Sequence, residues 1–171
     1  MATDLQQLNA VLQGGARANR FQVEFQLPAG VGGNLRNINL LAKTFPIPGV
    51  EIGTIEVKYK GLTGRLSDNS RVVTATTSPN FRLPANPAEI LNAFYDWASK
   101  CAPLDGSQTV PSDYKTDIVV RQLGTNKQVT FSWKLKGCWV SAIPEQEMNS
   151  EEAESIREFA PTLTVDDVEI I

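Results

Sequence analysis

The sequence contains no histidine, and this absence excludes the side chain that most often serves as a general base or metal ligand. It has only two cysteines, Cys101 and Cys138, whose separation matches no paired metal-ligand spacing. Cys101 ends an apolar helical pattern and Cys138 lies inside a strand pattern. Both are therefore interpreted as buried free thiols, with a disulfide as the alternative. We expect neither a metal site nor a cofactor.

Long hydrophobic runs are also missing, since no stretch approaches the roughly 20 apolar residues that a membrane-spanning helix needs. The first fifteen residues, MATDLQQLNAVLQGG, lack the basic start and the apolar core of a secretory signal. We therefore expect a soluble protein, made in the cytoplasm and without stable membrane insertion. The 171 residues fit one domain. We divide them into an N-terminal arm, residues 1–18, and a single β domain, residues 19–171.

Charge is distributed unevenly along the chain, although the net charge is only −3. Residues 1–144 hold 15 of the 16 Lys/Arg and 10 of the 19 Asp/Glu, a net charge of +5. Residues 145–171 hold nine acids and a single base, Arg157, a net charge of −8. Two such regions can attract each other within a molecule or between copies. The alternative is an ordinary solvated acidic tail.

Alternation of apolar and polar residues indicates several strands. Residues 20–27, RFQVEFQL, alternate cleanly, and residues 118–120 run through a Gly/Asn turn at 124–127 into a longer alternating strand, 129–136. Further strands are predicted at 35–45, 51–60 and 71–77, and residues 156–171 as a closing strand pair or one bent strand. The polar, glycine-bearing stretch 61–70 is interpreted as a long extended loop.

One strong helix is predicted at Asn86–Cys101, with Asn86 as cap and Pro87 at the first helical position. A short helix over residues 4–12, capped by Thr3 or Asp4, is a weaker possibility. Together these elements predict a mainly β fold: an antiparallel β-sandwich or partly closed barrel with one covering helix. The predicted core comprises Phe21, Val23, Phe25, Ile90, Phe94, Trp97, Val129, Phe131, Trp133 and Leu135.

No group of residues in the sequence has the pattern of a catalytic site. Asp166 and Asp167 are adjacent, so on a strand they point to opposite faces. The glutamates at 151, 152 and 154 have no metal-binding or basic partner nearby in sequence. Residues 61–65, GLTGR, lack the lysine and the helix that a phosphate-binding loop needs. We therefore expect a structural protein rather than an enzyme. A monomeric sandwich enzyme and a carbohydrate-binding module are the alternatives from other classes.

Six segments, in order, resemble those of a known family. They are RFQVEF at 20–25, FPIPGV at 45–50, NAFYDW at 92–97, IVVRQ at 118–122, WKLKGCW at 133–139 and FAPTLTVD at 159–166. No single motif is diagnostic, but the order and spacing are fairly specific from about Arg20 onward. In these segments the chain resembles the tail tube protein of contractile-tailed bacteriophages, which shares its fold with the type VI secretion tube.

The resemblance implies hexameric rings whose subunits pool their strands into one inner β-barrel and stack into a tube that conducts DNA without sequence-specific binding. The implied partners are copies of the chain, a sheath protein, and baseplate and tail-terminator proteins, in a virion assembled in the host cytoplasm. The alternatives are the tube of a bacteriocin-like or type VI system carrying protein cargo, and a baseplate tube initiator. Because free lysines would slow the passage of phosphates, acids are expected among them, or pairing of the lysines across subunits.

Two sets of candidate site residues follow from this resemblance. The polar faces of two strands are the candidates for the channel wall: Glu56, Lys58, Lys60, Thr130, Ser132, Lys134 and Lys136. The predicted loop and the N-terminal arm are the candidates for contacts between stacked rings: Leu62, Gly64, Arg65, Ser67, Asp68, Asn69, Leu5 and Leu8.

Overall fold

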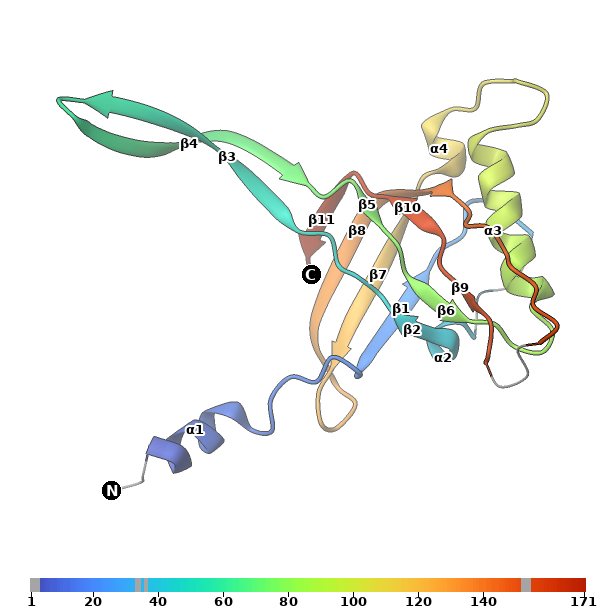
Figure 1. Cartoon of the computed structure of the whole chain (residues 1–171), viewed down its shortest axis with the longest axis horizontal. Coiled ribbons are helices and arrows are strands. Elements are labelled where there is room, and N and C mark those ends of the chain that lie inside the picture. Colours follow the sequence, from blue (N-terminus) through green and yellow to red (C-terminus); the bar gives the residue numbers. More distant parts are fainter. Residues whose placement is uncertain (1–3, 33–34, 36, 152–154) are drawn as a thin grey trace.

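The computed structural model describes residues 4–32, 35, 37–151 and 155–171, and within them the fold is mainly β, as predicted (Figure 1). The strands are β1 (Phe21–Phe25), β2 (Ala42–Thr44), β3 (Val50–Tyr59), β4 (Leu62–Val73), β5 (Thr76–Thr77), β6 (Asn80–Arg82), β7 (Thr116–Leu123), β8 (Val129–Ala142), β9 (Glu158–Phe159), β10 (Thr162–Thr164) and β11 (Asp167–Ile170). The helices are α1 (Asp4–Leu12), α2 (Ile38–Leu41), α3 (Ala88–Cys101) and α4 (Pro111–Tyr114).

The largest sheet has the strand order β1-β7-β8-β10-β5, and β11 also pairs with β8. A second sheet has the order β2-β6-β9, while β3 and β4 pair only with each other. All of these pairings are antiparallel. The hairpin predicted around the turn at 124–127 is confirmed as β7 and β8. Strand β8 is central because its first half pairs with β11 and its second half with β10.

Strand β8 changes its side-chain alternation at Gly137, whose φ of 63° lies in the left-handed region that favours glycine. Leu135 and Cys138 are both fully buried although they are three residues apart. A Cβ at position 137 would lie 2.2 Å from Oδ2 of Asp166. Glycine therefore lets β8 bend at the point where its partner changes from β11 to β10.

The core lies between the apolar face of the large sheet, the small sheet and α3. Phe94 and Trp97 of α3 are fully buried, together with Phe81 of β6 and Phe159 of β9. The rings of Phe94 and Phe159 meet edge to face, with centroids 5.3 Å apart. The indole Nε1 of Trp97 donates to the carbonyl of Tyr114 at 2.7 Å, which fixes the helix against α4. The predicted covering helix is thereby confirmed.

Helix α3 begins at Ala88 with Pro87 at its N-cap, one position later than predicted, although Oδ1 of Asn86 still accepts the N–H of Ala88 at 3.2 Å. Helix α1 also forms where the sequence allowed one, at residues 4–12. Thr3, the first of its two predicted caps, lies outside the described residues. Among the described residues, none of the helices combines the length and the apolar character that crossing a membrane would require.

Burial along the first half of β8 decreases toward the turn that joins it to β7. Leu135 is fully buried and Trp133 partly buried, but Phe131 is 38% exposed and Val129 is 52% exposed. The prediction that Val129 and Phe131 belong to the core is therefore wrong for the single chain. Alternation places Phe131, Trp133 and Leu135 on one face, opposite Gln122, Val120 and Ile118, but the register shifts before Val129, and alternation does not show how far the helix covers that face.

The other predicted core residues are buried to differing degrees. Val23 of β1 and Ile90 of α3 are buried, while Phe21 and Phe25 are half-buried against the core. Phe25 contacts the rings of Phe45, Phe81 and Phe94 at centroid distances of 6.0 to 6.2 Å. The aromatic cluster thus joins β1 to the helix and the small sheet.

Residues 61–70 do not form the predicted loop, because all but the first belong to β4. Strand β4 pairs with β3 over nearly its whole length, and the two strands project from the body as a long hairpin (Figure 1). The predicted strand 71–77 is divided between the end of β4 and β5. The loop prediction failed because polar residues and glycines are typical of loops, yet a hairpin exposed to water on both faces tolerates them.

The hairpin contains one bulge, at Asp68–Ser70 in β4. Thr54 pairs with Ser67, but Ile52 pairs with Arg71, so β4 has two extra residues opposite Gly53. The N–H and Oγ of Ser70 both donate to Oδ1 of Asp68, at 2.8 and 2.6 Å, and these bonds lower the pKa of that carboxyl group. A Cβ at position 53 would lie 2.1 Å from Oδ2 of Asp68, so a side chain there would displace the Asp68 carboxylate from this arrangement.

Two other segments differ from their predictions. Residues 35–45, predicted as one strand, contain the short helix α2 followed by β2. The closing segment forms three short strands, β9, β10 and β11, rather than a pair or one bent strand. Between them and β8, residues 144–149 contain neither helix nor strand.

Candidate functional site: an exposed hairpin and an ion-paired sheet face

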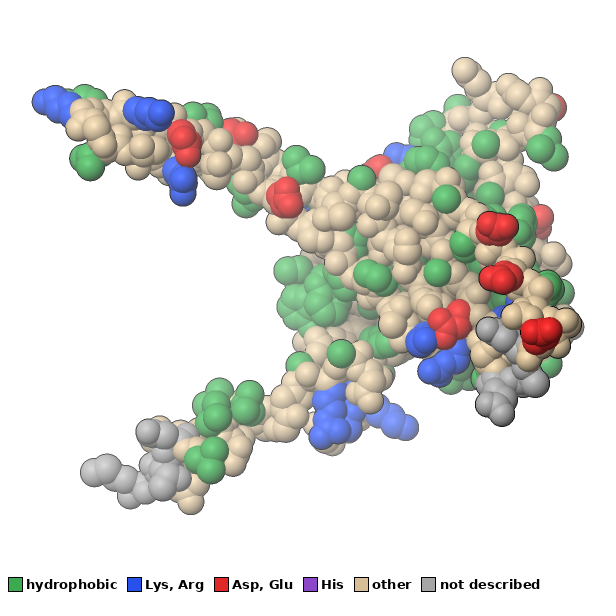
Figure 2. All heavy atoms as spheres, viewed as in Figure 1, with side chains coloured by type: hydrophobic (Ala, Val, Ile, Leu, Met, Phe, Trp, Pro, Cys, Tyr) green, Lys and Arg blue, Asp and Glu red, His purple; other side chains and the backbone are tan. Residues whose placement is uncertain are grey.

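The β3–β4 hairpin has an apolar face that no other described part of the chain covers. Its register places Ile55, Val57 and Tyr59 of β3 on the same face as Leu62 and Leu66 of β4. Their exposed fractions run from 46% for Val57 to 74% for Leu62. A two-stranded hairpin is marginally stable in water, and a large exposed apolar surface commonly marks an interaction site. This face therefore has the character of a surface that another molecule covers (Figure 2).

The opposite face and the tip of the hairpin are polar and mainly basic. Nε of Arg65 lies 3.3 Å from Oε1 of Glu56, and Lys58 lies next to this pair along β3. Lys60 occupies the turn with a φ of 47°, and its Nζ lies 5.4 Å from the centroid of the Tyr59 ring. The far end of the hairpin thus combines exposed apolar side chains with positive charge.

The polar face of the large sheet carries a ladder of ion pairs between neighbouring strands. Lys134 of β8 pairs with Asp117 of β7 at 3.1 Å, and Lys136 pairs with Glu169 of β11 at 2.6 Å. On the β1 side, Arg121 pairs with Glu24. All six side chains are between 30% and 48% exposed, so each pair contributes little to stability, but together they neutralise the face.

Hydrogen bonding and the charge of Glu169 raise the pKa of Lys136, so this amine stays charged and engaged with its partner. A fourth pair, Arg71 with Asp167 at 3.2 Å, lies at the edge of the sheet. The pairs join different strands of one chain. For Lys134 and Lys136 the expected mixture of lysines and acids agrees with this geometry, whereas Lys58 and Lys60 have no carboxylate partner among the described residues.

The structure divides the predicted channel-wall residues into two groups. Thr130, Lys134 and Lys136 alternate along the polar side of β8, and Ser132 shares that side but is only 7% exposed. Glu56, Lys58 and Lys60 lie instead on the projecting hairpin, away from the sheet (Figure 1). The two groups therefore do not form one surface within a single chain.

The predicted stacking residues also fall in two places. The set on β4 comprises Leu62, Gly64, Arg65, Ser67, Asp68 and Asn69. Leu5 and Leu8 lie on α1, where they are 67% and 52% exposed. Both the hairpin and α1 extend from the body on the same side of the molecule (Figure 1). The role of these residues in contacts between stacked rings remains a prediction.

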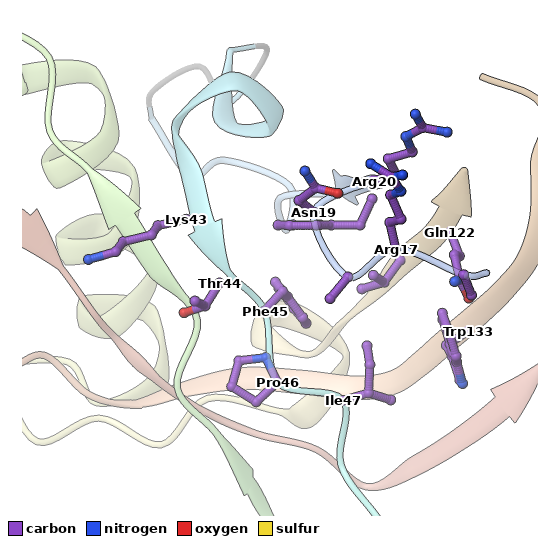
Figure 3. A pocket seen from close by; sticks show the side chains of 14 residues that line it. Arg17, Asn19, Arg20, Lys43, Thr44, Phe45, Pro46, Ile47, Gln122 and Trp133 are labelled. Carbon is purple, nitrogen blue, oxygen red and sulfur yellow. The ribbon is translucent and has the colours of Figure 1, made fainter. Parts of the chain in front are cut away.

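A groove of about 690 Å³ opens where α3 no longer covers the sheet (Figure 3). Phe45 and Ile47 line it from the segment after β2, and Trp133 lines it from β8. Arg17 of the arm and Arg20, just before β1, lie at its mouth. The lining is mostly apolar and contains no carboxylate, and its charged members are Lys43 and the two arginines.

Groups with possible chemistry are dispersed or buried. Asp166 pairs with Lys115 at 2.5 Å, whereas Asp167 pairs with Arg71, so the adjacent carboxylates have different partners. In the part of the chain that the structure describes, no three acidic or cysteine side chains gather as metal ligands would. Both cysteines are free, and burial raises the pKa of the Cys138 thiol to about 12. It raises the pKa of Cys101 as well.

Sequence reasoning missed two sets of residues. The first is the acidic half of the ladder, Glu24, Asp117 and Glu169, whose side of the sheet depends on the register between strands. The second is the apolar side of β4, where Leu66 was not among the candidates and Leu62 was named only as part of a predicted loop. Apolar residues alternate on both sides of Lys60-Gly61, at 55, 57 and 59 before it and at 62 and 66 after it. This pattern is typical of a hairpin with its turn at Lys60-Gly61 and could have predicted β4.

Comparison with known proteins supports the resemblance seen in the sequence. No family model matches the chain. The tail tube protein of Serratia phage KSP90 is 25% identical over 167 residues, which cover 93% of this chain and 92% of that protein.

Solved structures share the fold at low sequence identity. A sheath–tube complex of the PVC extracellular contractile injection system, in its extended state, contains a chain with a TM-score of 0.64 and 13% identity, covering 99% of both chains. The tube-terminating cap of the anti-feeding prophage gives a TM-score of 0.63 and 17% identity, covering 91% of this chain and 90% of that one. The predicted resemblance to tail tube proteins of contractile systems is thereby confirmed, and these relatives are structural proteins rather than enzymes.

Proposed function

We propose that the chain is the repeating subunit of a phage tail tube, in which six copies form a ring and stacked rings form a hollow conduit for DNA. The observation that carries this proposal is the projecting β3–β4 hairpin with its exposed apolar face, on a chain that matches a tail tube protein along nearly its whole length. In a stack, the hairpin would reach a copy in the next ring, where its apolar face would leave water.

The free edges of the large sheet support ring formation. The outer edges of β1 and β11 have no strand partner within the described residues. Exposed edges invite uncontrolled pairing, and a closed ring of sheets removes them. Joining β1 of one copy to β11 of the next would continue the sheet around the ring, with its ion-paired polar face toward the centre.

The charge ladder supports passage of DNA along that face. A protein binds DNA largely through free lysines and arginines that displace counterions from phosphates. Here Arg121, Lys134 and Lys136 already engage carboxylates. A wall of this kind would let phosphates pass without holding them. The outer surface would contact a sheath protein, and the ends of the tube would contact terminator and baseplate proteins.

A second candidate is the tube of a contractile injection system that carries protein cargo. The observation that favours it is the similarity to the PVC and anti-feeding prophage structures. A neutral, ion-paired wall would suit a folded protein as well as a nucleic acid. Nuclease-protected DNA in purified particles would support the first candidate, whereas co-purifying protein inside the tube would support the second.

Electron microscopy of the purified chain tests the tube itself. The full chain should form rings or tubes of uniform width with a central channel. In a shortened variant, the dipeptide Asn-Gly replaces Glu56–Arg65. A two-residue turn then connects Ile55 to Leu66, which is its partner across the hairpin. The variant should keep its β-rich circular dichroism spectrum and lose long tubes.

The matched control shortens the other hairpin by placing Asn-Gly in place of residues 124–128, and it should still form tubes. A wild-type chain that stays monomeric at every concentration, with or without a tube-initiating partner, would refute the proposal.

A further inference from the structure

We infer that the tip of the β3–β4 hairpin of one copy binds the acidic segment, residues 145–151 and 155–157, of a second copy. This rests on the proposed tube function and assigns the surface that receives the hairpin. The contact combines positive charge with exposed apolar side chains on the hairpin, and negative charge with exposed apolar side chains on the segment.

The hairpin tip presents charge that the chain itself does not neutralise. Lys58 and Lys60 have no carboxylate partner among the described residues, and Arg65 holds Glu56 only in an exposed pair at 3.3 Å. Tyr59 and Leu62 lie beside these cations and are 67% and 74% exposed. The tip is therefore both basic and apolar.

The acidic segment has the complementary character. Glu145, Glu147 and Glu151 are exposed, and none of them belongs to an ion pair in the part of the chain described, although seven such pairs neutralise acids elsewhere. Met148 is 75% exposed and Ile156 is 66% exposed. These two side chains could pack against the apolar side chains of the tip.

The segment is attached to the body at both ends, unlike a freely solvated tail. Nη2 of Arg157 donates to Oε1 of Gln146 at 2.8 Å, which joins one end of the segment to the other. The carbonyl of Arg157 accepts the N–H of Leu83 at 2.9 Å, and Ile143 packs against the core. A surface held in this way loses less conformational entropy when a partner binds.

The two surfaces lie at opposite ends of the long axis of the molecule (Figures 1 and 2). They therefore cannot meet within one chain, and the contact must be made between copies. A head-to-tail contact between unlike surfaces repeats from copy to copy, as an open stack requires. Complementary charge would also orient the approaching copies before the apolar side chains touch.

Another basic patch, Arg17 and Arg20, could compete for the acidic segment. Both residues lie at the mouth of the groove, close to the body. The hairpin is favoured because its cations stand beside exposed apolar side chains at the far end of the molecule. Charge reversal distinguishes the two patches.

The experiment uses the full chain and measures tube yield by sedimentation and electron microscopy at low and high salt. Reversing the tip, with Lys58→Glu and Lys60→Glu, should lower tube yield about tenfold, as should Glu147→Lys with Glu151→Lys. Combining all four changes in one chain should restore tubes, because each tip then meets an inverted segment. Lys127→Glu, at the exposed turn between β7 and β8, is the matched control and should leave the yield unchanged.

Three results would overturn the inference: unchanged yield after reversal at the tip, no rescue by the combined variant, or rescue of the inverted segment by Arg17→Glu and Arg20→Glu instead. A photo-crosslinking side chain at position 59 gives an independent readout and should attach to residues 145–151 or 155–157 of another copy. Tubes with crosslinks elsewhere would refute only this contact. Crosslinked dimers from a chain that forms no tubes would support the contact between hairpin and acidic segment and would refute the proposed tube function.

Discussion

Arg71 joins the base of the hairpin to the edge of the large sheet through Asp167. Its guanidinium lies 3.2 Å from the Asp167 carboxylate, and its Nη2 also donates to the carbonyl of Val168 at 2.5 Å. The same side chain therefore bonds to β11 twice while it belongs to β4. In the described residues the hairpin has no strand partner outside itself, so this link helps to set the direction in which it projects.

Arg71→Ala should loosen the hairpin without unfolding the body. Because both partners are about half exposed, the free energy of unfolding should fall by less than about 1 kcal/mol. Hydrogen exchange should become faster along residues 50–73, and tube yield should fall. Arg71→Lys, which retains the charge but not the paired geometry, should give an intermediate result. Unchanged exchange in Arg71→Ala would show that the hairpin is oriented by other contacts.

The ion-paired face leads to a prediction about DNA. Asp117→Asn together with Glu169→Gln removes the carboxylates that engage Lys134 and Lys136. The freed lysines should bind phosphate, so the variant should retain DNA that the wild-type protein releases, most strongly at low salt. A filter-binding assay over a salt series measures this. Asp96→Asn with Glu89→Gln, on α3, removes the same charge elsewhere and is the control; equal retention by both variants would contradict a role for this face.

The sequence predicted where individual strands and α3 form better than it predicted which strands pair with each other. The alternation of β1, β7 and β8 and the apolar stripe of α3 are properties of short segments, so the pattern of each segment was sufficient. Gly137 shows the limit, because the bend there depends on Asp166 and on a change of partner strand far along the chain. A regular alternation cannot show where the sheet needs such a bend.

The candidate site was predicted less well for a related reason. Lys134 and Lys136 were identified from their alternation, but their acidic partners lie on other strands and became visible only with the register. The hairpin was half recognised, since alternation predicted a strand at residues 51–60, in which Ile55, Val57 and Tyr59 form one face. That face is exposed in the single chain, and sequence periodicity does not distinguish burial within a chain from burial between copies.

Two tryptophans should respond differently to truncation. Trp97 is fully buried, so Trp97→Ala should lower the free energy of unfolding by about 3–5 kcal/mol. Trp133 is only partly buried and lines the groove, so Trp133→Ala should cost about 1–2 kcal/mol and leave a folded chain. Denaturant titration of both variants measures the difference. A Trp133→Ala variant as unstable as Trp97→Ala would mean that the groove closes over the indole in solution.

Cys138 should make stability depend on alkaline pH. Burial raises the pKa of its thiol from the ordinary 9.0 to about 12, so the folded chain keeps the proton while the unfolded chain releases it. The stabilising contribution is complete below about pH 9 and should be lost as the pH rises toward 12. Cys138→Ala cannot titrate, so the difference in unfolding free energy between it and the wild type should stay constant below pH 9 and shrink above it.

Alkylation provides the matching kinetic test, because the thiolate is the reactive form and Cys101 is less buried than Cys138. At neutral pH, iodoacetamide should modify Cys101 first and Cys138 only when the chain unfolds. Rapid labelling of Cys138 in the folded protein would contradict the assigned burial, and so would identical pH profiles for the wild type and Cys138→Ala.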